Sequence, residues 1–274
     1  MKPSSQSYLD NYYRNWHTKS PEEMEYDISA SVEKSAEACR LLNKIDIGPI
    51  NSVLELGCGF GRNIVEILNY TKASFGLGCD VSEKSIEFAN ENYANDTIRF
   101  LRTSSLDIQT TVSEIHEVYN NTFDLLILFD VLEHVPKPKE VIREISKMTK
   151  YFFIILPLDD TIFENYFLPE RAKVYPSFYH SDGHLWEFNV NDVHKFISSL
   201  GLAPIVYDYQ IWSTNAQFPS FLRPKSIKGK ILYNFWKWCN YLCKKLLPKK
   251  IFLRLMGRGY FVCLATWHSD NVLE

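Results

Sequence analysis

Short apolar runs alternate with amphipathic helical patterns through most of this chain, and this alternation restricts its fold more than any other feature. Parallel strands joined by crossover helices produce such a pattern. The predicted strands are 52–57, 74–80, 98–103, 123–129, 151–157, 203–209 and 260–267. The fourth and fifth of these are apolar at almost every position, which is typical of strands covered on both faces. We therefore expect a doubly wound α/β sheet.

Three segments do not follow the alternation: about the first 50 residues, a loop-rich stretch at 158–187 and a basic stretch at 211–259. Nothing resembling a linker separates them from the rest. We expect a single domain, 1–274, in which they are additions placed to grip a substrate. The predicted parts are an N-terminal helical lid at 1–50, a core at 51–210 and 260–268, and a basic aromatic insertion at 211–259. Crossover helices are expected at 62–70, 83–92 and 139–149.

Cysteine usage and hydropathy bear on the compartment. The six cysteines show no metal-ligand spacing and are expected to be reduced core residues. The N-terminus lacks the apolar segment of a signal peptide, and no later run offers about 18 uncharged apolar residues. We expect a cytoplasmic protein that does not span a membrane.

Charge is unevenly distributed. The net charge is −3, which does not suggest a nucleic-acid partner, yet Tyr209–Ser269 holds eleven basic residues and no acidic one. Within it, Lys230–Leu247 has helical periodicity, with an apolar stripe formed by Ile231, Phe235, Trp238, Leu242 and Leu246. Residues 223–258 could therefore lie on an anionic membrane surface, or the helix could pack on the body with its lysines in solvent.

A glycine-rich turn, VLELGCGFGRN (53–63), joins the first strand to a helix. Glycines let backbone N–H groups approach a ligand at the helix N-terminus, although a plain tight turn can have the same sequence. Asp80 ends the second strand, where a carboxylate can accept hydrogen bonds from ribose hydroxyls. Glu55, two residues before Gly57, would repel a pyrophosphate but suits an ammonium group. The turn therefore favours an adenosyl ligand with a positive charge over a dinucleotide.

Three motifs in order give the chain a wider resemblance. VLELGCGFGRN, GCDVSEKSIEFA (78–89) and FDLLILFDVLEHVPKP (123–138) are similar to motifs of the class I S-adenosylmethionine-dependent methyltransferases, in particular the ubiquinone-biosynthesis-like group. The resemblance implies S-adenosyl-L-methionine as cofactor. It also implies a Rossmann-like, seven-stranded doubly wound sheet, mostly parallel, with an antiparallel last strand and a helical insertion between the last two strands.

The resemblance further implies which residues contact the cofactor. Asp80 would hold the ribose and Val81 would pack on the adenine. The methionine end would be lined by Glu55, Gly57, Cys58, Gly59 and Gly61, with further contacts at Ser104, Ser105 and Phe129. One position departs from the family, because Ser104 stands where an acid usually binds the adenine amino group. Ser104 is a weak acceptor for that bond, Asp107 is a substitute, and a plain helix cap is the alternative role of Ser104.

Candidate catalytic residues are His184, His134 and Asp130. A hydroxyl acceptor needs a base, and histidine suits that role near neutral pH. In some quinone O-methyltransferases a related Glu-x-x-Glu-His is thought to hold a divalent ion, for which Asp130 could supply an oxygen, but we assign no metal here. A structural role remains open for His134. His184 could instead bond the backbone near the next helix, with Asn189 or Asn191 as its cap.

The acceptor is constrained mainly by a missing motif. The Asn/Asp-Pro-Pro-aromatic sequence of amino-methyltransferases is absent after the fourth strand, which disfavours nucleobase and glutamine amides. We expect O-methylation of a small, lipophilic or lipid-linked acceptor such as a quinone precursor or a glycan. A soluble N- or C-methyltransferase and a catalytically silent subunit that docks on a membrane or a partner are the alternatives.

Overall fold

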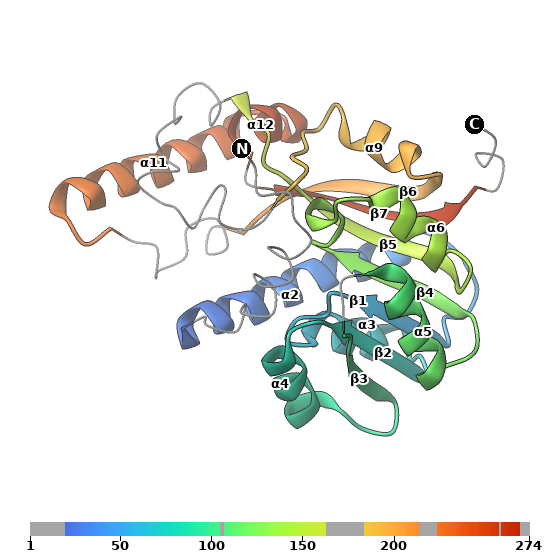
Figure 1. Cartoon of the computed structure of the whole chain (residues 1–274). Helices are drawn as coiled ribbons and strands as arrows, with labels where there is room; N and C mark the ends of the chain where they lie inside the picture. Colours follow the sequence, from blue (N-terminus) through green and yellow to red (C-terminus); the bar gives the residue numbers. More distant parts are fainter. Residues whose placement is uncertain (1–19, 105–106, 163–183, 214–223, 258, 269–274) are drawn as a thin grey trace.

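The computed structural model describes residues 20–104, 107–162, 184–213, 224–257 and 259–268. Within them a seven-stranded sheet forms the centre of the molecule, and helices cover both of its faces (Figure 1). The strands are β1 (Ser52–Leu56), β2 (Phe75–Asp80), β3 (Ile98–Arg102), β4 (Phe123–Phe129), β5 (Thr149–Leu158), β6 (Leu202–Ile211) and β7 (Gly259–Trp267).

The strand order is β3-β2-β1-β4-β5-β7-β6. Strand β7 runs antiparallel to both of its neighbours, and the other pairs are parallel. This confirms the doubly wound sheet with an antiparallel last strand, and each predicted strand boundary is correct to within two residues. The order reverses between β1 and β4, and in open α/β sheets ligands bind outside the carboxyl ends of the strands at such a point.

The helices form two layers around the sheet. One apolar cluster packs α2 and α3 on the first face, and a second packs α5, α6, α9 and α12 on the other. The helices are α2 (Pro21–Leu42), α3 (Arg62–Thr71), α4 (Glu83–Tyr93), α5 (Ile108–Val118), α6 (Pro138–Ile145), α9 (Val193–Ser199), α11 (Ile227–Leu246) and α12 (Lys249–Met256), with a 3-10 turn η2 at Leu132–His134. The helix predicted at 139–149 is too long, because β5 already begins at Thr149.

The central strands explain why the sheet needs both layers. Along β4, Leu126 and Leu128 pack into one cluster, and Leu125 and Ile127 pack into the other. Successive strand side chains point to opposite faces, so a strand with apolar side chains on both faces must be covered twice. All seven residues of β4 are buried, as the sequence predicted.

The N-terminal segment is described from residue 20 onward, so the predicted lid at 1–50 is visible only in part. Helix α2 begins with a capping box, in which Ser20 and Glu23 each accept a hydrogen bond from the other's backbone N–H. Its Ala38 and Leu41 are fully buried in the cluster that α2 shares with α3 and the sheet. In the described parts of the chain, no helix combines the length and the apolar character needed to cross a membrane.

The fold predicts a large difference between two isoleucines. Ile154 on β5 is fully buried, whereas Ile205 on β6 is 41% exposed. Ile154→Ala should lower the free energy of unfolding by about 2–5 kcal/mol, since it leaves a cavity in a close-packed layer. Ile205→Ala should lower it by less than about 1 kcal/mol. Urea denaturation followed by circular dichroism measures both, and equal losses would contradict the arrangement of the sheet.

Candidate functional site

The turn between β1 and α3 carries three glycines with left-handed backbone angles, at φ +69° for Gly57, +50° for Gly59 and +80° for Gly61. A Cβ atom added to Gly57 would lie 2.8 Å from Cγ2 of Val131, so this glycine lets the loop after β4 approach closely. A Cβ added to Gly59 would meet nothing within 4 Å. The turn is therefore tightly packed at Gly57 and borders open space at Gly59, where a ligand could approach the backbone.

Asp80, at the end of β2, connects this turn to the next one. Its carboxylate accepts hydrogen bonds from the N–H of Gly59 at 2.9 Å and from the N–H of Ser82 at 2.8 Å. The dense surroundings raise the pKa of Asp80, although these two bonds oppose the rise and the side chain stays partly exposed. Each carboxylate oxygen has another lone pair for a ligand hydroxyl. Val81, the predicted adenine contact, is buried beside it.

Glu55 is fully buried inside β1. Its carboxyl group accepts hydrogen bonds from Nδ2 of Asn63 at 2.9 Å and from the backbone N–H of Ile64 at 3.1 Å. Burial raises the pKa of Glu55 to about 8, against the effect of these two bonds. The helix α3 therefore begins on a carboxyl group that is costly to ionise until a positive charge comes near.

After β3, the helix-cap role considered for Ser104 is wrong, and its contact with the cofactor stays a prediction. Asp107, and not Ser104, caps α5, because its carboxylate accepts from the backbone and hydroxyl of Thr110, both at 2.9 Å. The N–H of Ser104 instead donates to the carboxylate of Glu114, a partner that the sequence reasoning missed. The hydrogen bonds from Thr110 lower the pKa of Asp107, and this carboxylate, considered as a substitute partner for the adenine amino group, thus already accepts two hydrogen bonds. Ser105 lies outside the described residues.

At the end of β4, Phe129 lies in an apolar environment and Asp130 in a charged one. The ring of Phe129 is buried edge-on against Phe153, with ring centroids 5.8 Å apart. Asp130 has a left-handed φ of +53°, which aspartate tolerates better than most residues, and its carboxylate forms an ion pair with Lys34 from α2. Burial lowers the pKa of Lys34, but the attraction of Asp130 outweighs this effect and raises it. Sequence alone offered no sign of this pair, whose members are 96 positions apart.

The turn after β4 and the segment after 183 bring Glu133, His134 and His184 together. Their potential ligand atoms lie within 4.8 Å of one another, and the two imidazole rings are 4.7 Å apart. Two backbone hydrogen bonds, from the N–H groups of Leu185 and Trp186 to the carbonyl of Glu133, hold the segments together. The cap considered at Asn189 or Asn191 is wrong, since Asp192 occupies the N-cap of α9.

Within this cluster His184 and Glu133 have unusual surroundings. Nδ1 of His184 lies 2.7 Å from a carboxylate oxygen of Asp159, which follows β5. Glu133 is fully buried, and among the described residues neither of its carboxyl oxygens has a hydrogen-bond partner. Burial, together with the charge of Asp130, raises the pKa of Glu133 well above its ordinary value, although His184 opposes this. An unsatisfied buried carboxyl group is costly and suggests that a ligand completes the site.

The cluster could have either of two chemical roles, as a metal site or as a general base. Two imidazoles and a carboxylate are a common donor set for Zn²⁺ and other divalent ions, and a carboxylate behind a histidine is typical of such sites. The same Asp159–His184 pair also suits a general base. Asp130 does not join the donor set, because its carboxylate contacts Lys34, so the metal arrangement considered from sequence is not formed as expected.

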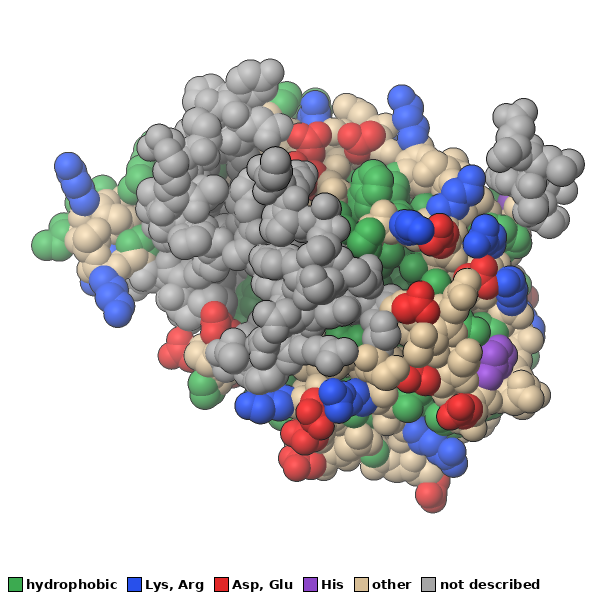
Figure 2. Space-filling model, viewed as in Figure 1, with side chains coloured by type: hydrophobic (Ala, Val, Ile, Leu, Met, Phe, Trp, Pro, Cys, Tyr) green, Lys and Arg blue, Asp and Glu red, His purple; other side chains and the backbone are tan. Residues whose placement is uncertain are grey.

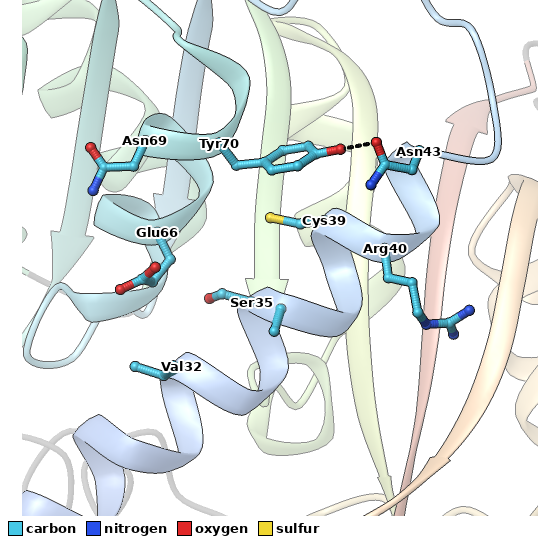
Figure 3. Close-up of a pocket in the computed structure, with 9 residues that line it drawn as sticks. Val32, Ser35, Cys39, Arg40, Asn43, Glu66, Asn69 and Tyr70 are labelled. Atoms are coloured by element: carbon cyan, nitrogen blue, oxygen red, sulfur yellow. Dashed lines mark hydrogen bonds between the residues drawn. The ribbon is translucent and has the colours of Figure 1, made fainter.

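A separate pocket of about 520 Å³ lies between α2 and α3. Figure 3 shows that Cys39 and Ser35 of α2 point toward α3, with Tyr70 closing one end through its contact with Asn43. None of the predicted cofactor or catalytic residues lines it. This pocket is therefore distinct from the site at the carboxyl ends of the strands.

The buried carboxyl group of Glu55 predicts a pH dependence. Its pKa is about 8 in the folded protein against 4.5 in an unperturbed side chain. Between these values unfolding releases a proton, so the free energy of unfolding should fall as the pH rises through this window. Glu55→Gln should flatten that fall, and Glu91→Gln on the exposed side of α4 should not. Urea denaturation at several pH values tests this, and an unchanged slope in Glu55→Gln would contradict it.

Comparison with known proteins agrees with this geometry. Residues 54–151 match the model of a methyltransferase domain. The chain is 28% identical over 98 residues to the ubiquinone biosynthesis O-methyltransferase of Neisseria meningitidis, a match that covers 36% of this chain and 39% of that protein. It is 34% identical over 101 residues to the Vibrio cholerae enzyme of the same name, covering 36% and 37%. The chain thus matches about two fifths of the length of these curated relatives.

Solved structures show the same fold over a much longer part of the chain. Magnesium protoporphyrin IX methyltransferase from Synechocystis, solved with bound SAH, superposes with a TM-score of 0.53 at 11% identity, covering 96% of this chain and 99% of that one. A putative methyltransferase from Haloferax volcanii, solved with the Trm112 activator, gives 0.56 at 12% identity, covering 95% and 97%. The matching domain, together with the sheet order and the three motifs, supports a methyltransferase domain of the class I S-adenosylmethionine-dependent type in this chain.

Proposed function

We propose that this protein transfers a methyl group from S-adenosylmethionine to a hydroxyl oxygen of a small acceptor. The observation that carries the proposal is the Asp159–His184 pair beside the buried carboxyl group of Glu133. This cluster follows the carboxyl ends of β4 and β5, and the contact between Val131 and Gly57 brings it next to the glycine turn. The proposed base, His184, and the glycine turn proposed to bind the methyl donor would then lie next to each other.

The residues around the turn fit the methyl donor. Four carboxyl groups lie in or after the carboxyl-terminal halves of β1, β2 and β4, those of Glu55, Asp80, Asp130 and Glu133. Burial raises the pKa of Glu55 and of Glu133, so a ligand that carries an ammonium and a sulfonium charge would favour their ionised forms, whereas a pyrophosphate would oppose them. When bound, S-adenosylmethionine supplies a methyl group already activated by the positive sulfur. The protein then needs mainly to align the acceptor with that methyl group.

His184 is suited to take the acceptor's proton. The carboxylate of Asp159 can only accept a hydrogen bond, so Nδ1 of His184 carries the proton and Nε2 is the basic nitrogen of the ring. Nε2 would accept the hydroxyl proton as the oxygen forms its bond to the methyl carbon. The carbon–sulfur bond breaks at the same time, and its electron pair stays on sulfur. Burial raises the pKa of Glu133 well above its ordinary value, and in its protonated form this carboxyl group would donate a hydrogen bond to the acceptor.

Two observations support oxygen, and a lipophilic compound, as the acceptor. The curated relatives are named as O-methyltransferases of ubiquinone biosynthesis, although each match covers only 36% of this chain. A helix with an exposed apolar face, α11, lies in the same chain. We propose a hydroxyl on a prenylated hydroquinone or a lipid-linked glycan as the class to test first.

Asp80→Ala tests cofactor binding. It removes the carboxylate that would hold the ribose and also the bond to the N–H of Gly59, so calorimetry should show no binding of S-adenosylmethionine or its demethylated product. Asp96→Ala, in the exposed turn before β3, is the matched control and should bind as the unaltered protein does. NAD should not bind to any of the three. Binding of the adenosyl ligands by Asp80→Ala would contradict the assigned cofactor site.

His184→Ala tests the base. Turnover should fall by about 100-fold or more, the usual contribution of a general base, while the affinity for S-adenosylmethionine stays unchanged. Asp159→Asn should produce a smaller fall, and His116→Ala on the exposed side of α5 should produce none. The assay follows labelled methyl transfer into prenylated hydroquinones and lipid-linked glycans.

A chelator distinguishes the two chemical roles of the cluster. Activity should survive dialysis against EDTA if His184 is a base. Loss of activity that Zn²⁺ restores would make His184 a metal ligand, and unchanged turnover in His184→Ala would remove it from the catalytic residues.

A further inference from the structure

Helix α11 has two apolar stripes, and only one of them faces the body. Residues three or four apart lie on the same side of a helix. The side toward the body carries Gly229, Tyr233, Trp236, Asn240, Cys243 and Leu247, all of which are buried or partly buried. Trp236, Cys243 and Leu247 pack against the core cluster that includes α12. This stripe is enough to hold α11 in place.

The other stripe lies about 200° around the helix, because it is offset by two residues. It is the stripe singled out from the sequence, and its residues are exposed except for Leu242, which is partly buried. Its exposed fractions are 66% for Ile231, 57% for Phe235, 57% for Trp238 and 77% for Leu246, and Ile227 before them is 80% exposed. The helix therefore packs on the body, as the alternative left open by the sequence had it, but through the other stripe. Contiguous exposed apolar surface of this kind typically marks an interaction site.

The charges around this stripe all have one sign. From Ile227 to Met256 the chain has eight basic residues and no acidic one. Three of them fasten the segment to the body: Lys244 donates to the carbonyl of Trp212, Lys249 to that of Tyr209, and Arg254 pairs with Asp160. Lys228, Lys230 and Lys245 stay exposed beside the apolar stripe. Figure 2 shows this mixture of blue and green side chains at the left, where Figure 1 places α11.

We infer that α11 docks on an anionic lipid bilayer. An amphipathic helix with Trp and Phe on one side and lysines beside them binds the boundary between headgroups and acyl chains, where the lysines meet lipid phosphates. The charge pattern selects this partner over a second copy of the chain. Two such helices face to face would bring lysines together with no acidic residue of the segment to balance them.

The docking surface is connected to the candidate site through α12. Arg254 on α12 pairs with Asp160, the neighbour of Asp159, so the helix that follows α11 is bound to the loop that positions His184. A protein docked through α11 would hold its acceptor site close to the bilayer. The inference about docking does not depend on which acceptor is methylated.

Vesicle cosedimentation of the full chain tests the inference. The protein should bind phosphatidylcholine vesicles that contain about 30% phosphatidylglycerol, and bind pure phosphatidylcholine at least about tenfold more weakly, with the difference reduced by salt. Phe235→Ser combined with Trp238→Ser should weaken binding by about tenfold or more. Lys228→Glu combined with Lys230→Glu should weaken it on the anionic vesicles alone. Ile205→Ser, at an exposed position on β6, should leave binding unchanged.

Binding of S-adenosylmethionine, measured in parallel, separates this inference from the proposed function. The stripe variants should bind it normally, which also shows that they are folded. Failure to bind anionic vesicles, or equal binding by the Phe235/Trp238 variant, would overturn the docking surface and leave the methyl-transfer proposal standing. A dimer in sedimentation analysis that the same variant abolishes would show that a second copy covers the stripe instead.

Discussion

The carboxyl group of Glu55 is the point at which the elements around the candidate site meet. It lies inside β1, accepts from the first turn of α3 through Asn63 and Ile64, and reaches α2 indirectly, since the hydroxyl of Ser35 bonds the side-chain oxygen of Asn63. One strand and two helices are thus fixed relative to one another by a buried acid. Burial makes that acid costly to ionise, and a cationic ligand beside it would reduce the cost.

The other carboxyl groups of the candidate site also favour a positive ligand. Glu133 is buried without a hydrogen-bond partner among the described residues, while Asp130 forms an ion pair with Lys34 of α2. Like charges held in one small volume repel each other and raise one another's pKa. The folded protein therefore tolerates an arrangement that a positive ligand would relieve. The free energy of folding that these buried carboxyl groups cost would be recovered when a positive ligand binds, and this makes the site selective for such a ligand.

Residues close in sequence were predictable, and contacts between distant segments were not. The strand positions followed from apolar runs and the turn from its glycines, because both depend on local chain geometry. The pairs Lys34–Asp130 and Asp159–His184 arise only when the topology joins separate loops, so neither could be read from spacing. For α11 the periodicity showed which residues share a face. It could not show which face meets the body, because the inward stripe contains Tyr233, Asn240 and Gly229 and is the less apolar of the two.

The insertion that carries α11 and α12 joins β6 to β7, two neighbouring antiparallel strands whose pairing extends to Ile211 and Gly259 at the insertion's two ends. A hairpin connection can lengthen or shorten without changing the register of the strands that it links. The turn that would hold the methyl donor lies across the sheet, between β1 and α3, and depends on none of those residues. The turn proposed to bind the donor and the helix proposed to dock on a surface can therefore evolve as separate parts, so that one is kept while the other is exchanged.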